Sequence, residues 1–204
     1  MKILSALAFT LLFAVPASAQ LSFRPYGMFA QQSFDADQTF KAVFDSSSGS
    51  FFGGGLNLTQ ADLFYLDIGA SRFRETGQRA FVNNGQVFKT GIPLTATIIP
   101  FEFSAGYRFM KGSRIRPYAG GGIGIYRYQE SSNFQDDGEA IDVRHAGAIV
   151  EGGAEIRLHA WFAAAADVHY TYVPGIIGDA GISKDEWETS LGGFQFRVRI
   201  IVGK

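Results

Sequence analysis

Apolar and polar residues alternate with a period of two through most of this chain, in segments separated by Gly-, Asp-, Asn- or Ser-rich stretches. This alternation predicts β-strands with one apolar and one polar face. Beyond residue 20, no apolar stretch approaches the roughly 20 residues that a membrane-spanning helix needs. We therefore expect an all-β protein with strands at residues 21–31, 51–59, 62–72, 92–109, 115–129, 143–157, 161–173 and 187–202.

The connections between these eight strands alternate in length. Those after the second, fourth and sixth strands are short, at residues 60–61, 110–114 and 158–160. The other four are long, at residues 32–50, 73–91, 130–142 and 174–186. An even number of antiparallel strands with tight turns at one end and long loops at the other is typical of bacterial outer-membrane barrels. We expect an eight-stranded antiparallel up-and-down transmembrane β-barrel, with both termini at the periplasmic, short-turn end.

Several strands show which face is apolar. Within residues 143–157, Ala146 and Val150 lie on one face, and Glu151 and Glu155 lie on the other. Within residues 92–109 the apolar positions change parity at Pro100, which predicts a β-bulge there. Glycines leave the facing of the first, second and fifth strands open. In the first long loop, three phenylalanines alternate with charged residues, which suggests that the first two strands extend outward as a hairpin.

Charge placement favours a lipid-facing exterior over the soluble, lipocalin-like barrel that the same alternation permits. Past residue 19, every lysine falls in a predicted loop or turn or at the end of the chain, whereas a water-exposed strand face normally carries several. Five arginines and five acids instead lie mid-strand on polar faces. A balanced set fits a narrow lumen, because an unpaired buried charge is strongly destabilising. We predict a luminal charge network of Arg24, Asp67, Glu102, Arg108, Glu151, Glu155, Arg157, Asp167, Arg197 and Arg199, with Glu155 and Arg197 as one candidate pair.

Residues 1–19 are expected to be a secretory signal peptide. Lys2 gives the segment a positive start, residues 3–15 are mostly apolar, and Ala17-Ser18-Ala19 forms a small-residue cleavage site. We predict cleavage after Ala19, which leaves residues 20–204 as the outer-membrane β-barrel.

Composition and spacing give little support for chemistry. The chain has no cysteine, which excludes disulfides and thiolate metal ligands, and its formal net charge of -1 gives no electrostatic footprint for nucleic acid. The histidines lie on different predicted elements, and the acidic run at 136–139 is more simply a solvated loop than a cation site. His169 and Thr171 suggest a lipid-modifying enzyme only weakly, because their predicted face is luminal. We expect no enzyme activity, no cofactor and no metal.

Two neighbouring motifs carry a resemblance to a known family. Gly106-Tyr107-Arg108-Phe109 is followed by a short basic turn and by Arg116-Pro117-Tyr118-Ala119-Gly120-Gly121-Gly122-Ile123-Gly124. This stretch resembles the small outer-membrane β-barrel family, the OmpA/OmpX-like eight-stranded group. The resemblance implies a location in the bacterial outer membrane, contact with its lipid and lipopolysaccharide, and recognition by the barrel-assembly machinery. The chain departs from the family in ending on Gly203-Lys204 instead of an aromatic residue.

Family resemblance defines a fold and not an activity, so three functions remain open. The balanced luminal charges favour a non-catalytic barrel with a side-chain-filled lumen, acting in envelope structure or in surface contacts through four long extracellular loops, for which an extracellular ligand is one candidate partner. The alternative is a small channel for hydrophobic or small solutes, as in OmpW-like barrels. A lipid-modifying barrel enzyme is the weakest of the three.

Overall fold

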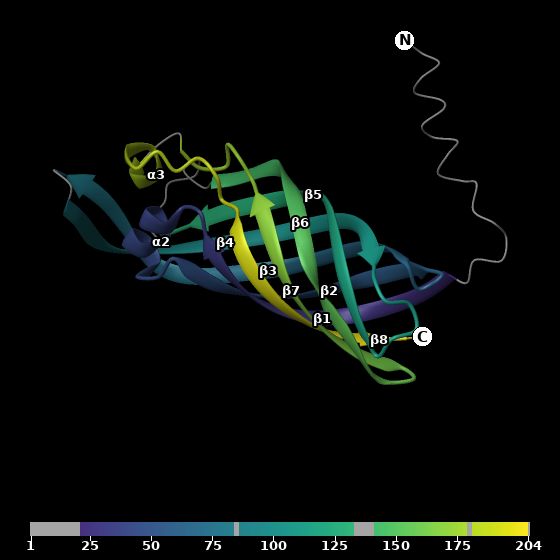
Figure 1. Ribbon diagram of the computed structural model, residues 1–204. Coiled ribbons are helices and arrows are strands. Elements are labelled where there is room, and N and C mark those ends of the chain that lie inside the picture. The colour runs from purple at the N-terminus through teal and green to yellow at the C-terminus, as the bar shows by residue number, and fades with distance from the viewer. Residues whose placement is uncertain (1–20, 84–85, 133–140, 179–180, 204) are drawn as a thin grey trace, which may run out of the picture.

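The protein is a closed barrel of eight antiparallel strands (Figure 1). The computed structural model describes residues 21–83, 86–132, 141–178 and 181–203, so the predicted signal peptide and the acidic run at 136–139 lie outside the described residues. Each strand pairs with its neighbours in sequence, and β1 closes the ring by pairing with β8. The expected fold class is confirmed. The strands are β1 (Leu21–Phe34), β2 (Ser48–Gln60), β3 (Phe64–Asn83), β4 (Gln86–Arg108), β5 (Ile115–Ser131), β6 (Ile141–His159), β7 (Phe162–Tyr172) and β8 (Gly193–Val202).

The third and fourth strands are much longer than the sequence predicted. β3 has 20 residues and β4 has 23, whereas about 9–11 residues suffice for a tilted strand to cross a bilayer. Residues 73–91, expected to be a loop, therefore belong largely to a β-hairpin that extends beyond the rest of the barrel wall (Figure 1). The prediction was wrong because this extension is exposed on both faces and lacks the alternation of a half-buried strand. Phe81 and Phe88 stack across it with ring centroids 5.5 Å apart.

Two short helices lie at the same end as this hairpin, which we call the long-loop end. Helix α2 (Asp37–Phe44) occupies the first long loop, so the predicted hairpin of β1 and β2 stops at Phe34 and Ser48. Helix α3 (Gly181–Asp185) lies in the last long loop. The eighth strand begins at Gly193 and not at residue 187, because residues 187–192 contribute to this loop and form a single bridge, Pro174 to Ser190. Among the described residues, no helix is long and apolar enough to span a membrane.

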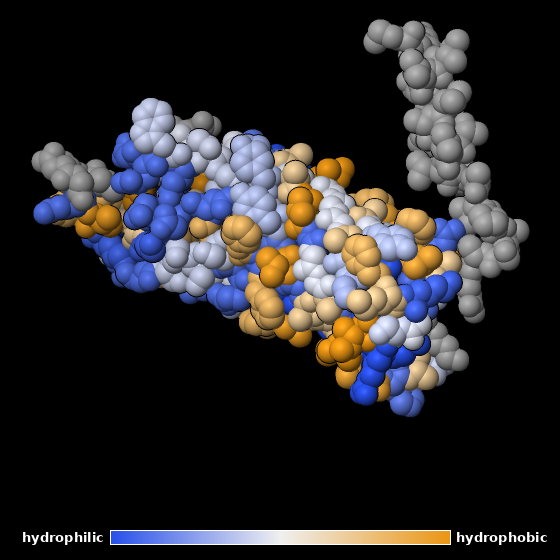
Figure 2. Space-filling view, viewed as in Figure 1, coloured by the Kyte–Doolittle hydropathy of each residue, from blue (hydrophilic) through white to orange (hydrophobic). Residues whose placement is uncertain are grey.

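The barrel wall is apolar on the outside across the short-turn part of the molecule. Outward-facing side chains include Phe52, Ile123 and Val150, with exposed fractions of 65%, 68% and 65%. Figure 2 shows hydrophobic side chains gathered over the middle and the short-turn part of one face, with hydrophilic side chains concentrated at the long-loop end. Soluble monomers rarely expose a continuous apolar band of this extent. The exterior is therefore suited to lipid.

The change of parity at Pro100 is not a bulge. β4 pairs with β5 in one unbroken register, through Ile99 with Arg127, Pro100 with Tyr126 and Phe101 with Ile125. The irregularity in β4 lies farther out, opposite residues 78–80 of β3. Even-numbered residues of β4 face inward on both sides of Pro100. The apolar residues change parity because the interior itself changes from polar to apolar along the barrel axis.

The long-loop half of the interior is filled by an apolar plug. Phe34 stacks on Phe40 of α2 with centroids 3.8 Å apart, and Phe73 lies against Phe51 at 5.4 Å. α2 thus adds its apolar side chains to those of the barrel wall, and together they form a water-excluded core like that of a soluble protein. The plug consists of Ala30, Phe34, Ala36, Phe40, Phe51, Phe73, Ala96, Ile98, Tyr126, Tyr128, Val173, Ile176 and Leu191.

A carboxylate from the last long loop holds α2 in place. Glu188 accepts hydrogen bonds from the backbone amides of Gln38 at 2.8 Å and Thr39 at 3.0 Å, and from the Thr39 hydroxyl at 2.6 Å. These amides belong to the first turn of the helix, where backbone N–H groups have no partner within the helix. Nearby, burial raises the pKa of the Asp35 carboxyl above its ordinary value. The first and last long loops are therefore joined over the barrel mouth.

Replacement of Glu188 by alanine is expected to loosen α2. Because the loss of a capping acceptor costs about 1 kcal/mol, amide protection within residues 37–44 should fall by roughly fivefold. Hydrogen exchange followed by mass spectrometry measures this change. Glu186→Ala is the matched control, because Glu186 is exposed and lies only two residues from Glu188. This variant should leave the amide protection of residues 37–44 unchanged. Equal exchange in both variants would show that Glu188 does not hold the helix.

Candidate functional site

The short-turn half of the lumen contains a dense network of charged and hydroxyl side chains. Every strand contributes inward-facing members, because side chains alternate across each strand and one face of every strand looks toward the axis. Of the ten predicted charges, eight are buried inside the barrel: Arg24, Asp67, Arg108, Glu151, Glu155, Asp167, Arg197 and Arg199. Glu102 is also inside, at the boundary with the apolar plug, where its carboxylate accepts a hydrogen bond from Tyr126 at 2.7 Å.

Glu155 holds two arginines near the short-turn end. Arg24 donates to both carboxylate oxygens of Glu155, at 3.0 and 2.6 Å, and Arg108 lies 3.1 Å from the same carboxylate. Arg108 also donates to Asn57 Oδ1 at 2.6 Å. The suggested pairing of Glu155 with Arg197 is therefore wrong. Residues far apart in sequence meet here because strands on opposite sides of a narrow barrel project long side chains toward one axis.

Arg199 links the next two carboxylates. Its guanidinium lies 3.1 Å from Asp67 and 3.2 Å from Asp167, and it donates to the Tyr118 hydroxyl at 2.5 Å. Asp67 also accepts from the Tyr26 hydroxyl at 2.6 Å. The rings of Tyr26 and Tyr118 both lie 5.3 Å from the Arg199 guanidinium carbon, so they cover its faces by cation–π contact.

Among the arginines of the network, Arg197 lies against the largest number of carboxylates. Its Nε donates to Asp167 at 2.5 Å, its Nη2 pairs with Glu151, and its Nη1 lies 3.7 Å from Glu102. One cation therefore faces three carboxylates that come from β4, β6 and β7. In a low-dielectric interior these acids depend on the guanidinium for their compensation.

Four tyrosines complete the network, and the sequence did not predict them. Tyr26, Tyr65, Tyr118 and Tyr126 are buried, and each hydroxyl donates to a carboxylate. Tyr65 reaches Glu151 at 2.8 Å because Gly106 and Gly120 leave room for its ring. A β-carbon at Gly120 would lie 2.2 Å from the Tyr65 hydroxyl and 2.6 Å from the Ala105 carbonyl oxygen. The absence of a side chain at Gly120 of β5 thus leaves the space that the Tyr65 ring occupies.

Gly120→Ala is expected to destabilise the barrel by about 1–3 kcal/mol, the usual cost of inserting a methyl group into a packed interior. The added methyl group displaces Tyr65 and removes its hydrogen bond to Glu151. Urea unfolding in phospholipid vesicles measures the loss. Gly27→Ala is the matched control, because a β-carbon there meets nothing within 4 Å. Similar stability of the two variants would contradict the packing role given to Gly120.

Arg157 lies outside this network, and Arg116 lies in a second ion pair that the sequence did not predict. The Arg157 side chain is 48% exposed at the short-turn end, 3.8 Å from Asp62. β6 has a register irregularity between residues 157 and 159, at the open end of the barrel, so parity no longer indicates a luminal position there. Arg116 is almost fully buried and pairs with Asp62 at 3.0 Å. Arg116 was not predicted because the sequence left the facing of the fifth strand open.

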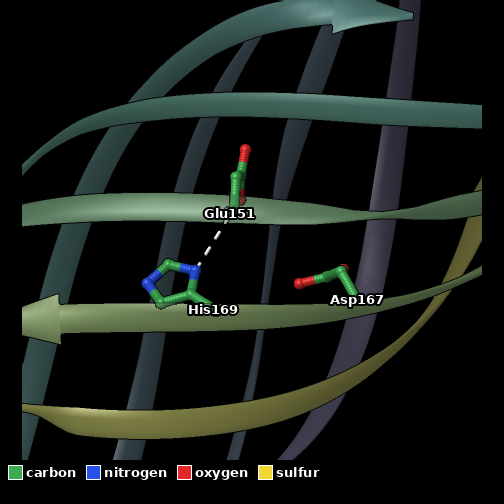
Figure 3. Close-up of side chains that lie close together, drawn as sticks. All are labelled: Glu151, Asp167 and His169. Atoms are coloured by element: carbon green, nitrogen blue, oxygen red, sulfur yellow. Dashed lines mark ion pairs between the residues drawn. The ribbon is translucent and has the colours of Figure 1, made fainter. Parts of the chain in front are cut away.

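Glu151, Asp167 and His169 lie close enough to suggest a metal site (Figure 3). All three are buried, on the neighbouring strands β6 and β7. However, Glu151 and Asp167 both direct oxygens at Arg197. A divalent cation would have to displace that guanidinium or lie next to it. The donor set therefore fits an internal ion pair better than a metal.

Ser104, Glu151 and His169 do not have the geometry of a hydrolase triad. Ser104 donates to Glu151 at 2.8 Å, and Glu151 lies 3.6 Å from His169 Nδ1, so the acid stands between the serine and the histidine. In a nucleophilic triad the histidine stands between the other two and takes the hydroxyl proton. The second ring nitrogen of His169 lies 3.4 Å from Glu102. His169 is thus placed between two carboxylates.

A closed eight-stranded barrel with an apolar exterior, short turns at one end and charged side chains inside is a transmembrane barrel of the outer-membrane type. The family model described as "Outer membrane protein beta-barrel domain" matches residues 5–194. The chain belongs to this family, and its location is the bacterial outer membrane.

Solved structures show the same fold at low sequence identity. The N-terminal β-barrel domain of Pseudomonas aeruginosa OprF aligns with a TM-score of 0.52 and 15% identity, over 92% of this chain and 100% of that one. Yersinia pestis Ail, in complex with the heparin analogue sucrose octasulfate, aligns with a TM-score of 0.55 and 11% identity, over 90% of this chain and 98% of that one. No curated protein matches the sequence. At these identities the likeness concerns the fold.

Proposed function

We propose that this protein is a closed, non-catalytic barrel that acts in envelope structure or surface contacts. The observation that carries the proposal is the filling of the lumen at two successive levels. The charge network occupies the short-turn half, and the apolar plug occupies the long-loop half. A solute crossing the barrel would have to separate buried ion pairs and then a packed core of phenylalanines, and each is costly.

The long-loop end supplies the surface for contacts. With the short turns at the periplasmic end, as in other barrels of this kind, the β3–β4 hairpin and helices α2 and α3 face the cell exterior. Trp187, beside α3, is 87% exposed. An exposed tryptophan on a loop held by the Glu188 cap is suited to anchor an extracellular ligand, because aromatic side chains contribute strongly to interfaces.

A non-catalytic role is supported by the partners of the buried polar groups. His169 and Thr171 are both buried in the lumen, away from lipid. His169 faces Glu102 and Glu151 instead of a hydroxyl nucleophile. The network is thus arranged to stabilise the barrel interior, and no residue of it is placed to attack a lipid substrate.

The route to the membrane is part of this proposal. Residues 1–19 act as a cleaved signal peptide, and the barrel-assembly machinery inserts residues 20–204. β8 carries Phe194 and Phe196 on its lipid-facing side, with exposed fractions of 62% and 55%. We infer that the assembly machinery reads these aromatics of the last strand. Amino-terminal sequencing of the mature protein tests the cleavage after Ala19.

Planar-bilayer recording tests the closed lumen. The folded, purified full chain is expected to give no stable single-channel current, because the ion pairs and the apolar plug leave no continuous aqueous path. Heat-modifiable electrophoretic mobility checks that the protein is folded, and a pore-forming peptide added to the same bilayer checks that currents are detectable. Stable currents from the folded protein would overturn the closed-barrel proposal and favour the small channel.

A further inference from the structure

Four arginines form a basic belt on the outer wall of the barrel. Arg72, Arg74, Arg127 and Arg144 all face outward, from β3, β5 and β6. Arg127 pairs in register with both Arg144 and Ile99. In the pairing of β3 with β4, Arg74 lies opposite Thr97. The same register puts Arg72 opposite Ile99, and therefore at the same height as Arg127. Strand pairing thus places Arg72, Arg127 and Arg144, which are far apart along the chain, in one row, with Arg74 one step farther toward the long-loop end.

This belt begins where the apolar band of the wall ends. The row of outward residues immediately below it is Ala70, Phe101, Ile125 and Ala146, which pair with one another across β3, β4, β5 and β6. Phe101 and Ile125 are each 55% exposed. A single step of two residues along these strands therefore changes the surface from wholly apolar to mostly basic. Such an edge fits the boundary between acyl chains and polar headgroups.

The belt carries more positive charge than its neighbouring acids neutralise, although Asp142 interacts with both Arg127 and Arg144. Arg127 pairs with Asp142 at 2.5 Å. Arg72, Arg74 and Arg144 are exposed and have no ion-pair partner in the part of the chain that the structure describes. Arg72 and Arg74 line a surface depression of about 410 Å³ together with Ser50, Phe52 and Glu75. This depression combines two guanidiniums, a hydroxyl and one carboxylate with the ring of Phe52, which lies beside Arg72 on the neighbouring strand.

We propose that the basic belt binds the phosphate groups of phosphorylated glycolipids in the outer leaflet. Guanidinium groups match phosphate oxygens in bidentate geometry, and basic side chains at a membrane interface attract anionic headgroups. Phe52 and the apolar row below the belt contact the acyl chains of the same lipid. The inference uses the outer wall and the membrane location, and it is independent of whether the lumen conducts.

Lipid binding to the detergent-solubilised full chain tests this inference. Native mass spectrometry compares retention of bis-phosphorylated lipid A with retention of dephosphorylated lipid A. Wild type is expected to prefer the phosphorylated form by about tenfold or more, since each Lys or Arg near an anionic surface contributes roughly a fivefold factor in affinity. The triple variant R72Q/R74Q/R144Q is expected to lose this preference, and R72K/R74K/R144K is expected to keep most of it.

The matched control neutralises three basic residues at the opposite end. K111Q/R114Q/R157Q changes the net charge equally and should keep the wild-type preference, because these exposed side chains lie at the short-turn end. Equal retention of the two lipid A forms by wild type would overturn the proposal, as would loss of the preference in the control variant. Displacement of lipid A by millimolar inorganic phosphate would also overturn it, because the belt would then be a site for free phosphate.

Discussion

Replacement of Arg197 by alanine is expected to lower the free energy of unfolding by about 3–5 kcal/mol, the range for breaking a buried ion pair on one side. The substitution removes the cation from between Asp167, Glu151 and Glu102. Those carboxylates stay buried in the lumen and repel one another, and only Arg199 beside Asp167 and His169 between Glu151 and Glu102 remain to compensate them. The loss comes less from the missing attraction than from the charges that remain.

Equilibrium unfolding by urea in phospholipid vesicles measures this loss. Arg114→Ala is the matched control, because Arg114 is exposed beside a short turn and should lose less than about 1 kcal/mol. Arg197→Lys keeps the charge but not the forked geometry, so we expect it to recover part of the stability. If Arg197→Ala were no less stable than Arg114→Ala, the buried network would not hold the barrel together.

Phe51→Ala is expected to cost about 3–5 kcal/mol, the range for a large aromatic side chain removed from a packed core. Phe51 is 1% exposed and lies in the apolar plug against Phe34 and Phe73. Truncation leaves a cavity that the surrounding rings fill poorly, since they are held by α2 on one side and by the barrel wall on the other. The lost burial and the cavity therefore add together.

Phe52→Ala is a control that differs only in the direction of the side chain. Phe52 follows Phe51 in sequence but faces outward with 65% exposure. Lipid chains fill the space left by truncation, so the loss is limited to the transfer of the side chain, at most about 1.5–3 kcal/mol. The same unfolding measurement compares the two variants. A loss at Phe52 as large as that at Phe51 would contradict the facing of β2 and the existence of the plug.

Much of the fold could be predicted because its signals repeat locally. Alternation indicated all eight strands, although it missed the outer parts of β3 and β4, and the rhythm of short and long connections predicted antiparallel order and closure. Of the candidate site, the inward charges on β6, β7 and β8 could be predicted in the same way, because apolar residues mark the opposite face of those strands. The tyrosines and Arg116 could not be predicted, because glycines on β5 remove the contrast between its two faces.

Partners could not be predicted from the same pattern. Glu155 pairs with Arg24 and Arg108 and not with Arg197, because strand tilt and register determine which side chains reach the same height across the lumen. Alternation reports the face of a residue but carries no information about its height. The basic belt depends on register too, since Arg72 and Arg144 share one row only through the successive pairing of β3, β4, β5 and β6.

The sequence by itself determined an eight-stranded barrel with short turns, long loops and an exterior for lipid, because a strand shows its two faces wherever it lies. The tertiary structure decided what fills the interior. Leu94, Ala96 and Ile98 look like outward residues by their chemistry, yet they face inward. Their environment is apolar because α2 and the long loops exclude water from that end of the barrel. That exclusion arises only when segments distant in sequence come together over one mouth.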